Sequence, residues 1–163
     1  MNRRQLLLAI AALATTPLLM RFSMAEQPLK IEKIIMSDAE WRERLNQQQY
    51  EILRSEGTER AGSSPLNDEK RKGTYHCAGC DLPLFHSEMK YDSGTGWPSF
   101  FDKIAGAVET KIDFKMIYPR TEYHCIRCGG HQGHLFKDGP QPTGLRYCNN
   151  GVALRFVPSN HFS

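Results

Sequence analysis

One pattern occurs twice in this chain, as Tyr75-His76-Cys77-Ala78-Gly79-Cys80 and again as Tyr123-His124-Cys125-Ile126-Arg127-Cys128. In each copy a short stretch with strand character enters a Cys-x-x-Cys turn. The two turns supply four thiolates, which form the complete tetrahedral shell of a structural zinc ion. Backbone amides in such turns can point at the sulfurs and soften their charge. We therefore expect one zinc ion on Cys77, Cys80, Cys125 and Cys128.

The alternative to a metal is a pair of disulfides, because exported proteins commonly carry them. The two cysteines of each pair are too close in sequence to staple distant parts of the chain. The 44 residues between the pairs exceed the spacing of a compact zinc ribbon. The metal is therefore predicted to clip a larger β domain.

The fifth cysteine, Cys148, is left without a structural partner, and such a thiol is a candidate nucleophile. Arg146 lies two residues earlier, where a strand would put both side chains on one face, and its guanidinium would favour the thiolate. Asn150 has the same parity and could orient a ligand.

Cys148 has an equally good structural interpretation as a buried cysteine. Strict alternation would place it on one face with the apolar residues Val152, Leu154 and Phe156. A bulge or turn at Asn149-Asn150-Gly151 would reset that register. The local pattern leaves both possibilities open.

Two further stretches carry residues suited to chemistry. The glycine-rich segment Gly129–His134, read as a loop, contains His131 and His134, and a histidine can hold a thiolate or deliver a proton near neutral pH. Both could instead be ordinary loop histidines or alternative metal ligands. Trp97 lies on a turn between Gly96 and Pro98, where it could form the wall of a pocket or pack in the core.

The N-terminus has the three-part layout of an export signal over residues 1–25. The basic start contains Arg3 and Arg4, an apolar run follows, and the small-residue pattern ends at Ala25. The adjacent arginines favour the twin-arginine route, with the general secretory route and an uncleaved anchor as alternatives. A periplasmic location is expected.

Charge excludes one class of partner. The chain has 21 basic and 18 acidic side chains, and residues 1–25 hold three of the basic ones and no acidic one. Removing that segment leaves 18 of each, so the mature domain is formally neutral and shows no electrostatic footprint for nucleic acid. About 138 residues remain, which is enough for one domain with a real core.

The remaining chain reads as two short helices followed by a β domain. Residues 26–36 are expected to form a linker, and the domain to cover 37–159. Ser37 and Glu40 form a capping box for a first helix, and a second is expected over Gln49–Arg54. Arg60–Gly73 reads as loop. Antiparallel strands are expected over Thr74–His76, Leu84–Phe85, Ala107–Asp113, Lys115–Pro119, Thr121–His124 and Val152–Val157.

Taken in order, these motifs resemble the B-type methionine-R-sulfoxide reductases from about Asp38 to Pro158. The series consists of Tyr50–Arg54, Gly57-Thr58-Glu59, both Cys-x-x-Cys pairs, Ser93-Gly94-x-Gly96-Trp97-Pro98-Ser99-Phe100, Gly130-His131-x-Gly133-His134-x-Phe136-x-Asp138-Gly139-Pro140, and Arg146-Tyr147-Cys148-x-Asn150. Each piece is modest evidence, but the whole series in order is highly specific.

The resemblance implies a mainly β fold of two small antiparallel sheets clipped by a structural zinc, with short N-terminal helices. It implies that Cys148 attacks the sulfoxide sulfur and becomes a sulfenic acid. His134 would supply the proton, with His131 in support and Asn150 as a further catalytic group. Substrate would be bound by four residues: Trp97, Phe136, Asp138 and Arg146.

The chain departs from the family at Thr95, where many members carry a second cysteine that condenses with the sulfenic acid. Every other cysteine is a predicted zinc ligand, so an external thiol, either a thioredoxin-like protein or a small dithiol, is expected to recycle a monomeric enzyme. The substrate would be methionine sulfoxide, free or in proteins. A zinc-clipped binding module and a Cys-His hydrolase or peroxidase are the alternatives from other classes.

Overall fold

The structure is a computed structural model that describes residues 31–115 and 117–159. The predicted export signal lies outside these residues and stays a prediction, as does most of the predicted linker. Residues 31–36 have no regular secondary structure, although the Ile34 N–H donates to the carbonyl of Arg127 at 2.7 Å. Within the described residues no helix is long and apolar enough to cross a membrane.

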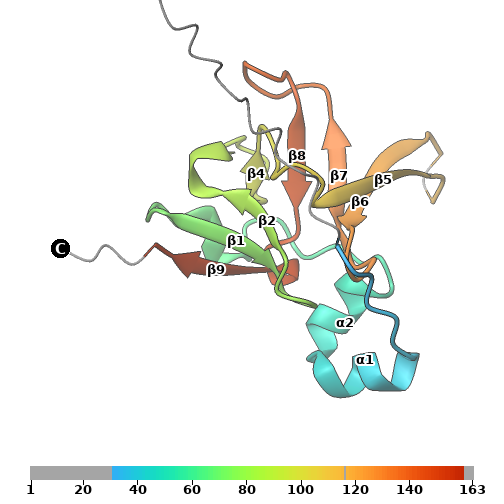
Figure 1. The fold of residues 1–163 in the computed structure, drawn as a ribbon. Coiled ribbons are helices and arrows are strands. Elements are labelled where there is room, and N and C mark those ends of the chain that lie inside the picture. The colour runs from blue at the N-terminus through green and yellow to red at the C-terminus, as the bar shows by residue number, and fades with distance from the viewer. Residues whose placement is uncertain (1–30, 116, 160–163) are drawn as a thin grey trace, which may run out of the picture.

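Two short helices, α1 (Asp38–Arg44) and α2 (Gln47–Leu53), lie together at one end of the molecule (Figure 1). The predicted capping box of α1 is confirmed, because the Ser37 side chain accepts from the Glu40 N–H and the Glu40 side chain accepts from the Ser37 N–H. Asn46 and Gln49 form a second box, which starts α2 two residues earlier than the sequence indicated. Trp41 and Leu53 anchor the helices in the core.

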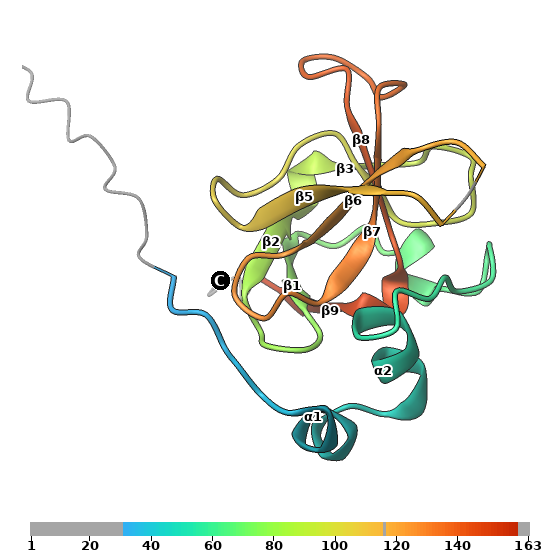
Figure 2. The same cartoon turned by 90° about the vertical axis from the view of Figure 1, so that its right-hand side faces the viewer.

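Nine strands form two antiparallel sheets in the described residues, as predicted (Figure 2). The smaller sheet has the order β2-β1-β9, with β1 at Gly73–Cys77, β2 at Pro83–His86 and β9 at Leu154–Pro158. The larger has the order β3-β4-β8-β7-β6-β5, with β3 at Lys90–Tyr91, β4 at Ser99–Phe100, β5 at Val108–Asp113, β6 at Arg120–Cys125, β7 at His131–Phe136 and β8 at Arg146–Asn149. Short 3-10 turns lie at Pro65–Asn67, Ser87–Met89 and Gly151–Ala153.

Two predicted elements are wrong. No strand forms at the described residues of the predicted strand Lys115–Pro119, which are 115 and 117–119. The Asp113 carboxylate accepts the Lys115 N–H at 2.8 Å and bends the chain at the end of β5. The predicted loop over His131–His134 is strand β7. Its Gly133 serves close approach, since a Cβ there would lie 1.9 Å from the carbonyl oxygen of Cys148 on the neighbouring strand.

Aromatic side chains from both sheets fill the core and hold β8 in place. Phe85 of the small sheet stacks on Phe100 of β4 with ring centroids 4.1 Å apart. Tyr147 of β8 packs edge-on against Tyr123 at 5.2 Å. Burying such a side chain is worth about 1.5–3 kcal/mol, so these contacts fix the backbone on either side of Cys148.

Candidate active site

Cys148 lies on β8 between two partner strands and is partly exposed. It is opposite Ser99 of β4 and opposite His134 of β7. Its neighbours Tyr147 and Asn149 point the other way, into the core, where the Tyr123 hydroxyl donates to Asn149 Oδ1 at 2.6 Å. Cys148 therefore faces outward on the same side of the sheet as His134.

The apolar face that suggested a buried Cys148 does not form. After Asn149 the chain leaves the six-stranded sheet, turns through Gly151–Ala153, and enters the other sheet as β9. Leu154 and Phe156 thus belong to a different sheet from Cys148. The interpretation of Asn149-Asn150-Gly151 as a register-resetting turn agrees with this geometry.

A β-bulge brings the two histidines of β7 together. Residues three apart in a regular strand point to opposite faces, but the register between β6 and β7 shifts between Tyr123 and His124, leaving Gln132 unpaired. The shift puts His131 and His134 on one face with their ring centroids 5.5 Å apart. The glycine-rich pattern concealed this strand.

Cys148 opens into a small cavity of about 120 Å³. The lining residues are Thr58, Trp97, Arg120, Gly133, His134, Phe136, Cys148, Asn149 and Asn150. The structure therefore brings five of the predicted site residues to one cavity. His131, Asp138 and Arg146 lie beside this lining rather than in it.

Arg146 is held by two neighbours. It makes a two-point ion pair with Asp138, with both nitrogen–oxygen distances at 2.8 Å. Its guanidinium also lies 4.2 Å from the centre of the Phe136 ring. Arg146 and Asp138 thus fix the position of Phe136 and place a charge near Cys148.

Trp97 forms part of the cavity wall, and Glu59 fixes it there. The indole N–H donates to the Glu59 carbonyl at 3.2 Å. The Glu59 carboxylate accepts the backbone N–H groups of Gly151 and Val152 at 2.6 and 3.0 Å. Thr58 and Glu59 belong to the Gly57-Thr58-Glu59 motif, which by itself indicates no structural role for either residue.

Both ends of the Asn150 carboxamide bind the backbone around the cavity. Its Oδ1 accepts the Glu59 N–H at 3.0 Å, and its Nδ2 donates to the Gln132 carbonyl at 3.0 Å. The side chain therefore ties the Glu59 loop to the β7 bulge. This contact pattern is that of a positioning residue.

His134 is paired with Asp113, which in turn is paired with Arg120, and the sequence alone pointed to neither residue. Its Nε2–H donates to Asp113 Oδ2 at 2.8 Å, and Arg120 donates to the same oxygen at 2.7 Å. Burial lowers the pKa of His134, the hydrogen bond to Asp113 opposes this, and the charge of Arg120 lowers it further. The pKa of Asp113 is held well below its ordinary value by the Lys115 N–H, His134 and Arg120. His134 is therefore neutral at pH 7.

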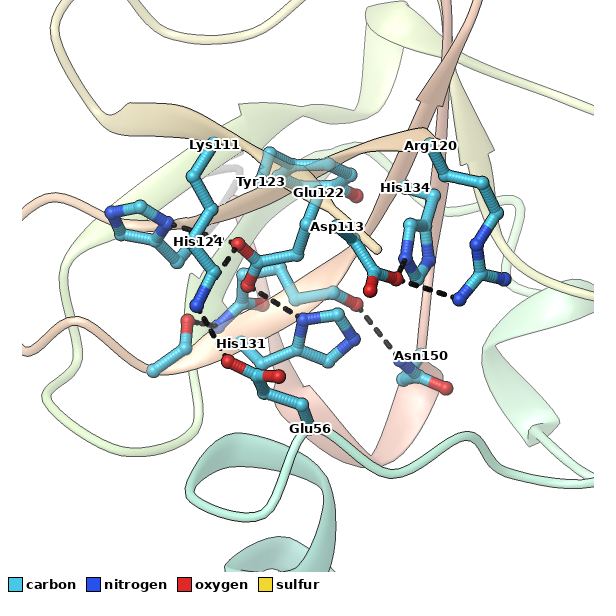
Figure 3. A network of polar contacts seen from close by, with 12 residues as sticks. Glu56, Lys111, Asp113, Arg120, Glu122, Tyr123, His124, His131, His134 and Asn150 are labelled. Carbon is cyan, nitrogen blue, oxygen red and sulfur yellow. Dashed lines mark hydrogen bonds and ion pairs between the residues drawn. The ribbon is translucent and has the colours of Figure 1, made fainter. Parts of the chain in front are cut away.

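A second carboxylate, that of Glu122, forms a hydrogen bond with His131 (Figure 3). Both side chains are almost fully buried, and the His131 Nδ1–H donates to Glu122 Oε1 at 2.7 Å. Burial alone would raise the pKa of Glu122, but hydrogen bonds from His124 and His131 and the charge of Lys111 lower it to about 2. His131 Nε2 is buried without a hydrogen-bond partner in the described residues.

Cys148 is less acidic than the neighbouring Arg146 suggested. Burial raises the pKa of its thiol, and this outweighs the charge of Arg146 and the hydrogen bonds from Thr95 and Arg146, which lower the pKa. Asp138 adds a smaller raising effect. Before substrate binds, Cys148 is therefore mainly a thiol at neutral pH.

The four paired cysteines form a buried cluster that could hold a metal ion. Their sulfurs all lie within 4.8 Å of one another, with Cys77–Cys128 at 3.6 Å and Cys80–Cys125 at 3.5 Å. A tetrahedron with zinc–sulfur bonds of about 2.3 Å has edges of about 3.8 Å, so the donor set fits zinc. None of the five cysteines of the described residues forms a disulfide.

Amide groups point at two of these sulfurs, one from the backbone after the second turn, as expected, and one from a side chain of β7. The Gly130 N–H donates to Cys128 Sγ at 3.4 Å, and the Gln132 side chain donates to Cys77 Sγ at 3.4 Å. The carbonyl of Gln132 also accepts from Asn150 at the cavity. The bulged residue thus connects the cysteine cluster with the cavity wall.

Comparisons with known proteins place the chain in a family. The protein-family model that describes the SelR domain matches residues 45–158 of this chain. The peptide methionine sulfoxide reductase MsrB of Agrobacterium fabrum is 52% identical over 127 residues, which make up 77% of this chain and 94% of that protein. The MsrB of Pseudomonas putida is 51% identical over 130 residues, or 78% of this chain and 97% of that protein.

A plant relative shows the same likeness over part of its length. The chloroplastic peptide methionine sulfoxide reductase B1 of Oryza sativa subsp. japonica is 50% identical over 121 residues, which make up 74% of this chain. The match covers 56% of that longer protein. The chain therefore belongs to the SelR-domain family, the B-type methionine sulfoxide reductases.

Proposed function

We propose that this protein reduces methionine R-sulfoxide to methionine, using Cys148 as the nucleophile. The observation that carries the proposal is the small cavity around Cys148 and His134, which lie opposite each other on neighbouring strands. The rings of Trp97 and Phe136 also line this cavity. The relatives named as peptide methionine sulfoxide reductases support the same reaction.

The reaction balances with one thiol and one sulfoxide. The Cys148 sulfur attacks the sulfoxide sulfur, a proton reaches the sulfoxide oxygen, and the sulfur–oxygen bond of the substrate breaks as oxygen passes to Cys148. Methionine leaves, and Cys148 remains as a sulfenic acid. Cys148 is thereby oxidised by two electrons, and the substrate sulfur is reduced by two.

The aromatic rings and the polar groups of the cavity are proposed to bind different parts of the sulfoxide group. Trp97 and Phe136 offer apolar surface for the substrate methyl group. His134 and Asn150 form the polar side, toward which the sulfoxide oxygen would point. The asymmetry favours one epimer at sulfur, which the resemblance assigns as R.

The cysteine cluster is proposed to hold one structural Zn²⁺ on Cys77, Cys80, Cys125 and Cys128. The ion would supply a cross-link between elements rather than chemistry. Cys77 ends β1 of the small sheet, and Cys125 ends β6 of the large sheet. The bound ion would therefore clip the two sheets together.

One single-turnover experiment tests both the reaction and its intermediate. The reduced protein receives one equivalent of purified R or S methionine sulfoxide without added reductant. The R epimer should give one methionine and a dimedone-trapped sulfenic acid at Cys148, and the S epimer should give neither. Equal conversion of both epimers would refute the stereochemical assignment, and conversion without oxidation at Cys148 would refute the mechanism.

The same experiment addresses recycling. Thr95 lies within hydrogen-bonding reach of Cys148 but cannot form a disulfide with it. We propose that an external thiol reduces the sulfenic acid of a monomeric enzyme directly. Thr95→Cys should convert the sulfenic acid into a disulfide between the introduced thiol and Cys148 after one turnover. An internal disulfide in the unmodified protein, made at the expense of the cysteine cluster, would contradict this route.

The protonation of His134 is expected to determine how fast the single turnover is on the plateau of its pH profile. Its Nε2–H is committed to Asp113, so only the imidazolium carries a second proton, on Nδ1, that could pass to the sulfoxide oxygen. Raising the pH removes this imidazolium through its lowered pKa and forms the Cys148 thiolate through its raised pKa. Between the two pKa values, the imidazolium fraction of His134 falls with pH as steeply as the thiolate fraction of Cys148 rises. The product of these two fractions is therefore constant, and the single-turnover rate should be flat from about pH 6.5 to about pH 9.

Two variants test this. His134→Ala should lower the plateau by about 10²–10⁴-fold, the usual contribution of a general acid. Asp113→Asn replaces the carboxylate, whose charge and charged hydrogen bond raise the pKa of His134, by a neutral acceptor, so the plateau should fall and extend to lower pH. Glu88→Gln, an exposed carboxylate outside the cavity, is the control. Wild-type plateaus in both site variants would reduce His134 to a structural role.

A further inference from the structure

The hairpin that joins β5 to β6 carries an unusual apolar surface. Among the residues that the structure describes, five large apolar side chains are strongly exposed, and four of them lie here. They are Ile112, Phe114, Ile117 and Tyr118, with exposed fractions of 63%, 74%, 105% and 62%. Ile112 is the strand neighbour of Asp113 and therefore points to the opposite face of the sheet from the cavity. We call the other three residues, Phe114, Ile117 and Tyr118, the apolar ridge. Clustered apolar exposure of this kind marks interaction sites more often than scattered single residues do.

The apolar ridge is attached directly to the active site. Asp113, one residue before Phe114, holds His134, and Arg120, two residues after Tyr118, lines the cavity. Two residues of extended chain span at most about 7 Å, so the ridge begins at the edge of the cavity. The hairpin itself projects away from the helices and the small sheet (Figure 1).

Several contacts fix the hairpin that carries the ridge. The Asp113–Arg120 ion pair closes its base at 2.7 Å. Glu56, which follows α2, pairs with Lys111 at 2.5 Å and with Lys115 at 2.6 Å. The hairpin is therefore tied to the body of the protein through β5 and through its turn.

The same contacts leave the ridge without a free positive charge. Lys111, Lys115 and Arg120 each have a carboxylate partner within the protein. Binding to an anionic lipid surface draws on uncompensated Lys and Arg. The ridge thus offers apolar side chains with neutralised surroundings, which suits an uncharged polypeptide segment better than an anionic membrane.

We propose that the apolar ridge is the docking surface for the polypeptide residues that flank the oxidised methionine in a protein substrate. This inference rests on the proposed function. A cavity of about 120 Å³ admits the end of one side chain, so the rest of a polypeptide substrate must lie across the rim. On the β5–β6 side that rim is the apolar ridge. Segments with apolar neighbours around methionine are those that unfolding exposes.

The test compares two substrates in one assay with dithiothreitol as reductant. One is N-acetyl-methionine R-sulfoxide, which can occupy only the cavity. The other is a nonapeptide with one central methionine R-sulfoxide and Leu and Val on both sides. The measured quantity is the ratio of kcat/KM for the peptide to kcat/KM for the small substrate.

Phe114→Ser with Tyr118→Ser should lower this ratio at least tenfold, mainly through KM, because losing an anchoring aromatic contact commonly costs about tenfold in binding or more. Ile35→Ser, the remaining strongly exposed apolar residue of the described chain, is the matched control and should keep the wild-type ratio. A peptide flanked by Ser and Gly should show little difference between the variants.

An unchanged ratio in the double variant would overturn the docking proposal. Loss of binding to phosphatidylglycerol vesicles with an unchanged ratio would assign the ridge to a membrane instead, and would also overturn it. If the wild-type protein fails to reduce the small substrate, the proposed function itself fails. The two failures are therefore distinguishable.

Discussion

Cys148→Ser should abolish sulfoxide reduction while the protein stays folded and keeps its cysteine cluster. A neutral hydroxyl is a far poorer nucleophile than a thiolate, and it cannot take the oxygen as a sulfenic acid. Removing a catalytic nucleophile typically costs well over about 10³-fold in kcat. We expect a loss of that size in the single-turnover rate with methionine R-sulfoxide.

The structure makes this substitution a clean test. Cys148 makes none of the contacts of the four-cysteine cluster, and its side chain faces the cavity rather than the core. The fold is therefore held by the neighbours Tyr147 and Asn149, which the variant retains. Circular dichroism and metal content should match the wild type. Substantial single-turnover activity in the variant would remove Cys148 from the mechanism.

The parts of the fold that follow local rules could be predicted from the sequence. The capping box at Ser37 and the entry of two strands into cysteine turns depend on residues a few positions apart. Strand β7 could not be predicted, because Gly129, Gly130 and Gly133 read as loop. Gly133 is required by the approach of the Cys148 carbonyl, a contact that only the folded sheet creates.

The site residues also divide into those that local sequence indicates and those that only the folded sheet brings together. Elimination made Cys148 a candidate, and its position on a turn made Trp97 one, but each kept a structural alternative until the series of motifs was compared with the family. Asp113, Arg120 and Glu122 were missed because charged residues on strands look like a solvated face. They meet the histidines only when β5, β6 and β7 pair, and the bulge at Gln132 then adds His131 to the same side.

The cysteine cluster is where the second large effect is expected. Cys125→Ser should leave little folded protein, because it removes one ligand from a fully buried set of four. Binding of a structural zinc is worth about 10–16 kcal/mol in small peptides, whereas a whole domain is stable by about 5–15 kcal/mol. Loss of the ion would also separate β1 from β6, which belong to different sheets.

Elemental analysis of the wild-type protein should find one zinc per chain, and strong chelation should lower the thermal unfolding temperature sharply. Cys148→Ser is the matched control, since it removes a sulfur from outside the cluster. Folded, active protein without metal would contradict the prediction, as would mapped Cys77–Cys80 and Cys125–Cys128 disulfides. Partial metal loss should affect activity before unfolding is complete, because Gln132 contacts both Cys77 and Asn150. A cluster that makes no contact with substrate would thus still control the shape of the cavity.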